Sequence, residues 1–98
     1  MQTPEAKVKT KLKRYFAEER KNGHELYFYW PVPTGFGETT LDCLCCYDGK
    51  FIGIECKREG IRKPTPRQAA VMARIRAAGG VTYLVTMKDG ELEWIEIK

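Results

Sequence analysis

Several common signals are missing from this sequence. No apolar run approaches the ~18 residues that a membrane span needs, and residues 1–21 have a charged, helical pattern rather than that of a signal peptide. Internal repeats and low-complexity stretches are also missing. We therefore expect one cytosolic domain, residues 1–98, with no membrane segment and a small core.

A cysteine and histidine zinc site is also not expected. The four cysteines contain no C-x-x-C pair, and the only histidine, His24, is distant from them in sequence. Without an export signal, buried reduced thiols are the better interpretation. The cysteines are Cys43, Cys45, Cys46 and Cys56.

A nucleotide-binding P-loop is likewise missing. Residues 32–40 contain Pro33, Gly35 and Gly37 and are predicted to form a loop. Gly35-Phe36-Gly37 could let backbone amides approach a phosphate, but no G-K-[ST] follows. A plain flexible connection is the simpler interpretation of these glycines.

Basic residues are present in excess, and they are unevenly spread. Residues 1–23 hold seven Lys and Arg against three acids, residues 55–76 hold seven against two, and the last eleven residues reverse the balance. Such a surface favours a polyanionic partner, nucleic acid first. Ordinary solubility charge explains the composition equally well.

A β-hairpin is the strongest local prediction. Two apolar runs flank Asp48-Gly49, which is the preferred sequence for a two-residue turn. That turn places Tyr47 opposite Lys50, so Asp42 faces Glu55 on the same side of the sheet. Both faces of the hairpin carry apolar residues, so we expect both to be covered.

Charged groups therefore converge at the open end of this hairpin. Lys57 lies two residues beyond Glu55 and projects from the same face. Opposed carboxylates repel, and a divalent cation would relieve that repulsion. A surface salt bridge at a strand end, worth at most ~1 kcal/mol, is the structural alternative.

The remaining pattern predicts an α/β fold. Thr3-Pro4-Glu5 begins a helix that runs to about Lys21, and Thr65-Pro66-Arg67-Gln68 begins one that runs to about Ala78. Further strands are expected at 26–30, 81–86 and 92–97, the last as an alternating edge strand. The aromatic strand 26–30 is apolar on both faces, which suits an inner strand or one under a dimer partner. Core packing of its rings is favoured over base stacking.

Two further polar residues point inward from first helical turns. Glu5 lies on the apolar stripe of the first helix, although an acid there also complements the helix dipole. Gln68 lies on the apolar stripe of the second helix, although it also completes a capping box. The sequence leaves both choices open.

Taken together, these residues resemble a known nuclease family. Asp42, twelve intervening residues and Glu55-Cys56-Lys57 resemble the D…(D/E)-x-K core of the PD-(D/E)XK, or restriction-endonuclease-like, superfamily. With Glu5 and Thr65-Pro66-Arg67-Gln68, the chain is similar to the virus-type replication-repair nuclease (VRR-NUC) domain in its minimal, phage-type stand-alone form. Leu41 stands where the superfamily name implies Pro. The resemblance covers Glu5 to about Val85.

The resemblance implies a restriction-endonuclease-like αβββαβ core: a mixed central sheet flanked by helices, here with an extra C-terminal edge strand. It implies a phosphodiester hydrolase that uses Mg²⁺, or Mn²⁺ in its place. Such an enzyme, encoded by a phage or a bacterium, would act in the cytosol of the bacterial cell. The metal ligands would be Asp42, Glu55 and the Cys56 carbonyl, with Glu5 joining directly or through water. Lys57 would orient the attacking water or stabilise the pentavalent phosphorus, and Gln68 would position that water or a ligand.

DNA is the expected substrate. Four cations flank the acidic residues and would grip phosphates without reading bases, although a solvated basic loop also explains each one. They are Arg58, Arg62, Lys63 and Arg67. We expect a homodimeric endonuclease with no small-molecule cofactor, acting on branched or Holliday-junction DNA in replication or repair. A non-catalytic nucleic-acid-binding module on the same fold, and a small interaction domain whose aromatic strand mediates oligomerisation, are the alternatives.

Overall fold

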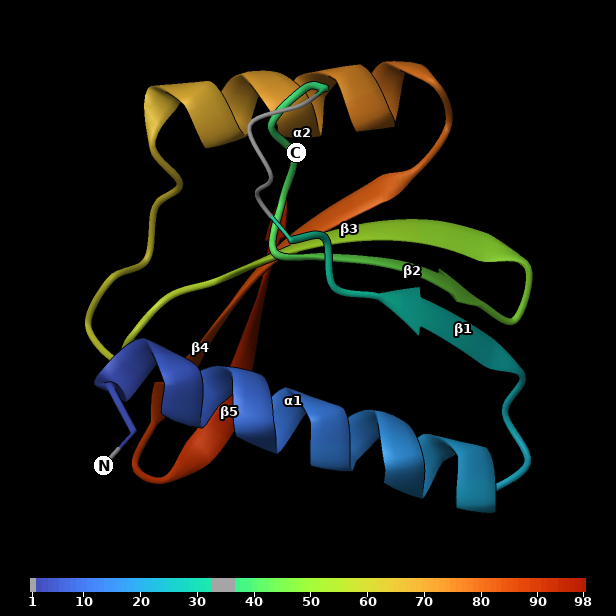
Figure 1. The fold of residues 1–98 in the computed structure, drawn as a ribbon, viewed down its shortest axis with the longest axis vertical. Coiled ribbons are helices and arrows are strands. Elements are labelled where there is room, and N and C mark those ends of the chain that lie inside the picture. Colours follow the sequence, from blue (N-terminus) through green and yellow to red (C-terminus); the bar gives the residue numbers. More distant parts are fainter. Residues whose placement is uncertain (1, 33–36) are drawn as a thin grey trace.

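The computed structural model describes residues 2–32 and 37–98. The predictions made for Pro33, Gly35 and Phe36 lie outside the described residues. Two helices and five strands form an α/β fold, with three strands after the first helix and two after the second (Figure 1). The elements are α1 (Pro4–Lys21), β1 (Leu26–Tyr29), β2 (Cys43–Tyr47), β3 (Lys50–Cys56), α2 (Pro66–Ala77), β4 (Val81–Lys88) and β5 (Glu91–Ile97).

The strands form one mixed five-stranded sheet in the order β1-β2-β3-β4-β5. All neighbours are antiparallel except β3 and β4, which are parallel and joined through α2. Tyr47 pairs with Lys50 and Cys43 with Ile54, so the predicted hairpin register is confirmed. Asp48 and Gly49 both have positive φ, as the tight turn requires.

The aromatic strand is at an edge of this sheet, which corrects the expectation of an inner strand. Among residues 2–32 and 37–98, β1 pairs only with β2, and it ends at Tyr29 rather than at Trp30. Its outer face carries Tyr27 and Tyr29, which are 70% and 54% exposed. Apolar content on both faces of a strand therefore did not indicate a central position here, because the outer rings remain in solvent.

α1 packs against one face of the sheet and forms the main core. Thr3 caps the helix by accepting a hydrogen bond from the Ala6 N–H, and Pro4 occupies its first position, as predicted. Three apolar side chains of α1 meet the hairpin face that carries Cys43, Cys45, Ile54 and Cys56. These helical residues are Val8, Leu12 and Phe16.

α2 covers the opposite face, mainly over β3 and β4 (Figure 1). Met72 and Leu84 are fully buried in this second layer, and Leu41 nearly so. The helix does not cover β2 on this face, so Cys46 is exposed. The other three cysteines are buried free thiols. The expectation that all four thiols are buried is therefore wrong at Cys46. The expectation that both faces of the hairpin are fully covered is also wrong, on the α2 side.

The opposite edge of the sheet is formed by β5, so the edge strand predicted at residues 92–97 is confirmed. In the part of the chain that the structure describes, β5 pairs only with β4, in antiparallel register, after a tight turn at Asp89-Gly90. Within the described residues, no helix is long and apolar enough to cross a membrane.

Candidate functional site

The open end of the hairpin locks two carboxylates together. Glu55 Oε1 accepts a hydrogen bond from the Asp42 backbone N–H at 3.1 Å, and Asp42 Oδ2 accepts one from the Cys56 N–H at 2.9 Å. Each side chain is thus held by the backbone of the facing strand. This exchange follows from the register: the last pair of the ladder is Cys43 with Ile54, and residues 42 and 55 come next on either side. Asp42 and Glu55 lie together, as the sequence pattern predicted.

Gln68 reaches Glu55 from the first turn of α2. Its Nε2 donates to Glu55 Oε2 at 2.8 Å, while its Oε1 accepts from the Thr65 N–H at 2.9 Å. Thr65 Oγ1 in turn accepts from the Gln68 N–H, which completes the capping box. The two roles that the sequence left open are therefore both filled, because the two ends of one amide point in different directions.

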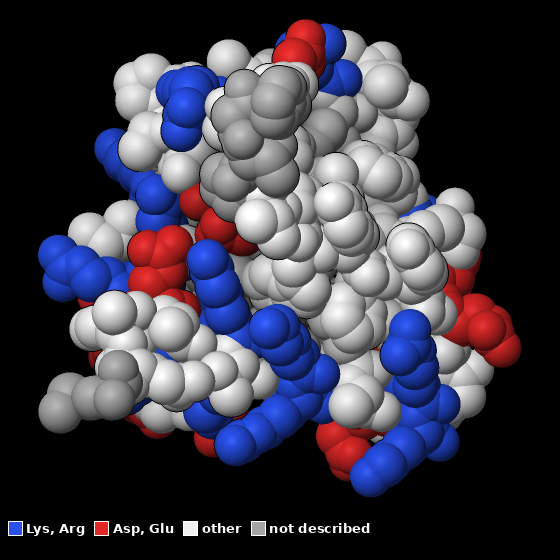
Figure 2. Space-filling view, viewed as in Figure 1, with Lys and Arg blue, Asp and Glu red and all other residues white. Residues whose placement is uncertain are grey.

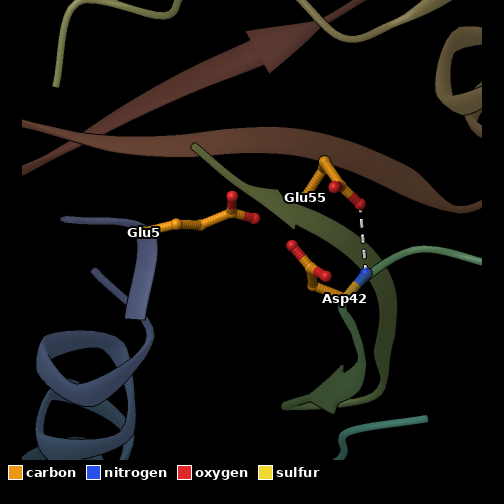
Figure 3. Close-up of side chains that lie close together, drawn as sticks. All are labelled: Glu5, Asp42 and Glu55. Carbon is orange, nitrogen blue, oxygen red and sulfur yellow. Dashed lines mark hydrogen bonds between the residues drawn. The ribbon is translucent and has the colours of Figure 1, made fainter. Parts of the chain in front are cut away.

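Glu5 completes the group from α1. One carboxylate oxygen from each of Glu5, Asp42 and Glu55 lies within 4.8 Å of the others. Figure 3 shows the three carboxyl groups turned toward one another, one from α1 and two from the end of the hairpin. The position of Glu5 on the core-facing stripe of α1 is what brings it there. We call these three residues the acidic cluster.

Lys9 also enters the acidic cluster, and the sequence analysis missed it. Its Nζ lies 3.4 Å from Asp42 Oδ1. The available signal was its spacing, since Lys9 follows Glu5 by four residues and so shares its face of the helix. Partial burial tends to lower the pKa of Lys9, but Asp42 and Glu5 outweigh it and the pKa is raised.

Glu55 carries the electrostatic strain of the cluster. Its side chain is buried, with 4% of the residue exposed, and Asp42 faces it. Burial and then the Asp42 charge raise the pKa of Glu55 to about 7, while Lys57 pulls it the other way. A carboxyl in this environment gains from a nearby cation more than an exposed one does.

The two other residues of the E-x-K motif stand beside the cluster. Cys56 ends β3, and its N–H bond to Asp42 brings its peptide to the site. Its thiol is buried on the α1 side, where burial raises its pKa. Lys57 follows the strand and is half-buried; its N–H donates to the Val85 carbonyl. In residues 2–32 and 37–98, no carboxylate pairs with its ammonium.

The four cations predicted to contact DNA differ in their surroundings. Arg58, Lys63 and Arg67 are exposed, whereas Arg62 Nη1 is 2.5 Å from Glu93 Oε1 on β5. Arg62 is therefore tied to the sheet edge, and the acidic C-terminal segment supplies its partner. The sequence alone gave no sign of that pairing.

Further cations line α1 beside the cluster. Lys13 lies on the same helical stripe as Lys9, with its Nζ 5.0 Å from the centre of the Trp30 ring. Arg20 lies farther along the same stripe, with its Cζ 5.2 Å from the centre of the Phe28 ring. It also donates a hydrogen bond to the Leu26 carbonyl at 3.0 Å. Figure 2 shows acidic side chains between the two helices, with Lys and Arg around them and along α1. We call Lys13 and Arg20 the α1 cations.

The donor set of the cluster fits a hard divalent cation. All three side chains offer oxygen atoms, which Mg²⁺ and Mn²⁺ prefer. Opposite ligands of octahedral Mg²⁺ lie ~4 Å apart, slightly less than the 4.8 Å limit of the cluster. A small movement of these side chains, or a water between one of them and the ion, would close that difference.

Comparisons with protein-family models, with curated proteins and with solved structures gave no match to this chain.

Proposed function

We propose that this chain is a metal-dependent DNA endonuclease with a restriction-endonuclease-like core. The observation that carries the proposal is the acidic cluster. Residues 5, 42 and 55 come from two separate elements, yet their carboxylates meet within 4.8 Å. Glu55 is buried among them, with Lys57 two residues beyond it on the same strand end. A structural sheet end gives no reason to bury like charges together.

The metal ligands in this proposal are Asp42, Glu55 and the Cys56 carbonyl, with Glu5 directly or through water. Bound Mg²⁺ or Mn²⁺ would act as a Lewis acid toward the phosphate and lower the pKa of a coordinated water. The protein's own task is to hold the ligands rigidly. The backbone N–H bonds to Asp42 and Glu55 do this, and Gln68 fixes the outer oxygen of Glu55.

Lys57 supplies the fixed positive charge of the site. Its ammonium has no carboxylate partner among the described residues, so it is free to face a phosphate oxygen. There it would stabilise the negative charge on the phosphoryl oxygens in the pentavalent transition state, or orient the attacking water. Gln68 contributes indirectly, by holding Glu55 in place.

DNA would lie over the cluster and be held by its backbone. Arg58, Lys63 and Arg67 are exposed on one side, and the α1 cations extend along the other. None of these groups forms a base-reading element, so we expect selection of DNA shape, with branched or junction DNA as the preferred substrate. Arg62 remains a candidate contact only if it exchanges Glu93 for a phosphate.

The test is a cleavage assay on junction, flap, nicked and linear DNA, with Mg²⁺, with Mn²⁺ and with EDTA. We expect metal-dependent cleavage that EDTA stops and that Glu55→Ala reduces by at least about a hundredfold, the scale set by losing a metal-holding group. Glu59→Ala is the matched control, because Glu59 is an exposed acid in the turn after β3. Equal cleavage by Glu55→Ala and wild type would refute the assignment.

The same protein preparation separates the alternative of a non-catalytic module. Calorimetry with Mn²⁺ should detect binding by the wild type and none by Glu55→Ala. A wild type that binds DNA in a salt-sensitive way, but binds no metal and cuts no substrate, would be a nucleic-acid-binding module. Undetectable DNA binding at low salt would point instead to an interaction domain.

A further inference from the structure

Each of the four carboxylate oxygens of Asp42 and Glu55 already has a partner in this structure. Asp42 Oδ2 accepts the Cys56 N–H, Glu55 Oε1 accepts the Asp42 N–H, and Glu55 Oε2 accepts the Gln68 amide. The remaining oxygen, Asp42 Oδ1, is the one that Lys9 faces at 3.4 Å. Three partners are neutral amides, and only the fourth carries a charge.

That charged partner is also the one that neither the backbone nor a second hydrogen bond fixes in place. The other three donors belong to the backbone or to an amide that is itself fixed by the capping box. The Lys9 side chain is 36% exposed, and at 3.4 Å its contact is looser than a short charged hydrogen bond. Lysine holds its charge on a flexible four-carbon stem that can turn away without disturbing the helix.

We propose that Lys9 is a built-in countercharge that occupies the cation position on Asp42 and must withdraw when a divalent ion binds. This inference rests on the proposed function, and it adds a competition between an internal cation and the metal. Lys9 keeps the carboxylates together while no metal is bound, and it weakens metal binding by the free energy of its own contact. A positioning residue of this kind acts through Asp42.

When a metal ion displaces Lys9 from Asp42, the lysine takes a second position along α1. Once released from Asp42, its ammonium remains on the same helical face as Glu5 and one turn from Lys13. It then continues the row of α1 cations, where a DNA phosphate is the available anion. Metal binding and the growth of the basic row are thereby coupled through one side chain.

The test compares Mn²⁺ affinity, by calorimetry, in wild type, Lys9→Met, Lys9→Arg and Lys7→Met. Lys9→Met removes the charge and keeps the length, so we expect Mn²⁺ to bind about threefold to tenfold more tightly, the scale of a partly exposed ion pair. Lys9→Arg restores a cation and should return the affinity toward wild type. Lys7 is exposed two residues away, and its replacement should change nothing.

Thermal unfolding gives a second, independent measure. Without metal, Lys9→Met should unfold at a lower temperature than wild type, because the carboxylates lose their countercharge. Saturating Mn²⁺ should raise its midpoint by more than it raises that of wild type. A purely structural lysine would lower both midpoints and leave or weaken the affinity.

These outcomes test the role of Lys9 separately from the metal site. Equal or weaker Mn²⁺ binding by Lys9→Met, beside clear binding by wild type, overturns the role of Lys9 and leaves the metal site standing. If wild type itself binds no Mn²⁺, the proposed metal site fails and the role of Lys9 fails with it.

Discussion

Glu55 shows at the level of one residue how burying a carboxyl beside another carries a cost to the fold. Its carboxyl is nearly excluded from water and faces Asp42, which raises its pKa to about 7. Burying two like charges together destabilises the native state, and the contact of Lys9 with Asp42 still leaves the pKa of Glu55 raised. A bound divalent cation would offset this cost, so metal and folding should be linked.

The first prediction follows from that linkage. Millimolar Mn²⁺ or Mg²⁺ should raise the unfolding temperature of the wild type by about 5 °C or more, since ~1 kcal/mol shifts a domain of this size by that amount. Glu55→Gln should abolish the shift because it removes the buried charge. Differential scanning calorimetry with and without EDTA measures it. A shift that persists in Glu55→Gln would locate the metal elsewhere.

A second residue-scale prediction concerns the only histidine. His24 Nδ1 lies 2.7 Å from Asp48 Oδ2. That hydrogen bond, the largest influence on each partner, raises the pKa of His24 and lowers the pKa of Asp48. The His24 contribution is complete below its unfolded pKa of ~6.5 and is lost as pH rises through the higher folded value. The Asp48 contribution is present above ~3.9 and is lost as pH falls through the lower folded value.

The pair should therefore stabilise the protein most between about pH 4 and pH 6.5. NMR titration of the His24 ring should give a pKa above 6.5, and Asp48→Asn should bring it down toward that value. An unchanged histidine pKa in Asp48→Asn would show that the contact does not persist in solution. His24→Asn should flatten the pH dependence of stability in the same range.

The positions of side chains were predictable from the sequence only where spacing fixes them. The register of a two-residue turn sufficed to place Asp42 against Glu55, and helical periodicity put Glu5 and Gln68 on inward faces. Contacts between distant parts of the chain were not predictable. The approach of Lys9 to Asp42 and of Arg62 to Glu93 depends on how the elements pack, which no local pattern encodes.

At the scale of elements, the close fit of α2 against the hairpin depends on one glycine. A Cβ at Gly53 would lie 2.7 Å from Ile75 Cδ1 on α2 and 2.9 Å from Leu41 Cδ1. Both contacts are shorter than atoms tolerate, and Leu41 is buried next to Asp42. Gly53 thus sets the distance between the hairpin and the helix that carries Gln68.

We predict that Gly53→Ala lowers the free energy of unfolding by about 1–2 kcal/mol, as overpacking does when only side-chain ends must move. The displacement should also loosen the Gln68–Glu55 hydrogen bond and weaken metal affinity. Urea denaturation and Mn²⁺ calorimetry measure the two effects. Gly49→Ala is no suitable control, because its φ is +85°; Cys46→Ala, on the exposed face of β2, is a better one.

The α1 cations give a second element-scale prediction. Lys13 and Arg20 are held against aromatic rings, so their charges are fixed in a row that leads away from the cluster. Replacing both with Ala should weaken binding to every DNA sequence alike and reduce the salt slope by about 2. Fluorescence anisotropy over a salt series measures this. Lys50→Ala, at the far turn of the hairpin, should leave the slope unchanged; equal slopes in the double variant and wild type would remove α1 from the DNA interface.

The elements themselves were largely predictable because their ends are marked by strong local signals. Thr-Pro pairs begin both helices, and Asp-Gly pairs form both tight turns. The place of β1 was not predictable, since strand order depends on which hairpin edge remains open after β4 joins β3. Of the two positions that the sequence suggested for this aromatic strand, the inner one is wrong, and the one under a dimer partner stays a prediction.

On the scale of the whole molecule, the open edge bears on assembly. Within the described part of the chain, the outer edge of β1 pairs with no other strand, and it lies next to the exposed Tyr27 and Tyr29. This combination is typical of a surface that pairs with another strand. We predict that a second copy pairs here to give the expected homodimer. Sedimentation equilibrium should show a dimer for wild type and a monomer for the Tyr27→Lys, Tyr29→Lys double variant. A monomeric wild type at tens of micromolar would contradict the prediction.

The start of α1 beside the carboxylates has a practical meaning for anyone preparing this protein. Glu5 stands in the first helical turn, whereas Lys98 follows the edge strand β5, and Figure 1 shows the two ends of the chain well apart. A purification handle fused ahead of Gln2 would emerge next to Glu5, and a polyhistidine sequence there would compete for any added ion. Fusion after Lys98, with untagged material as reference, keeps such artefacts away from the assays.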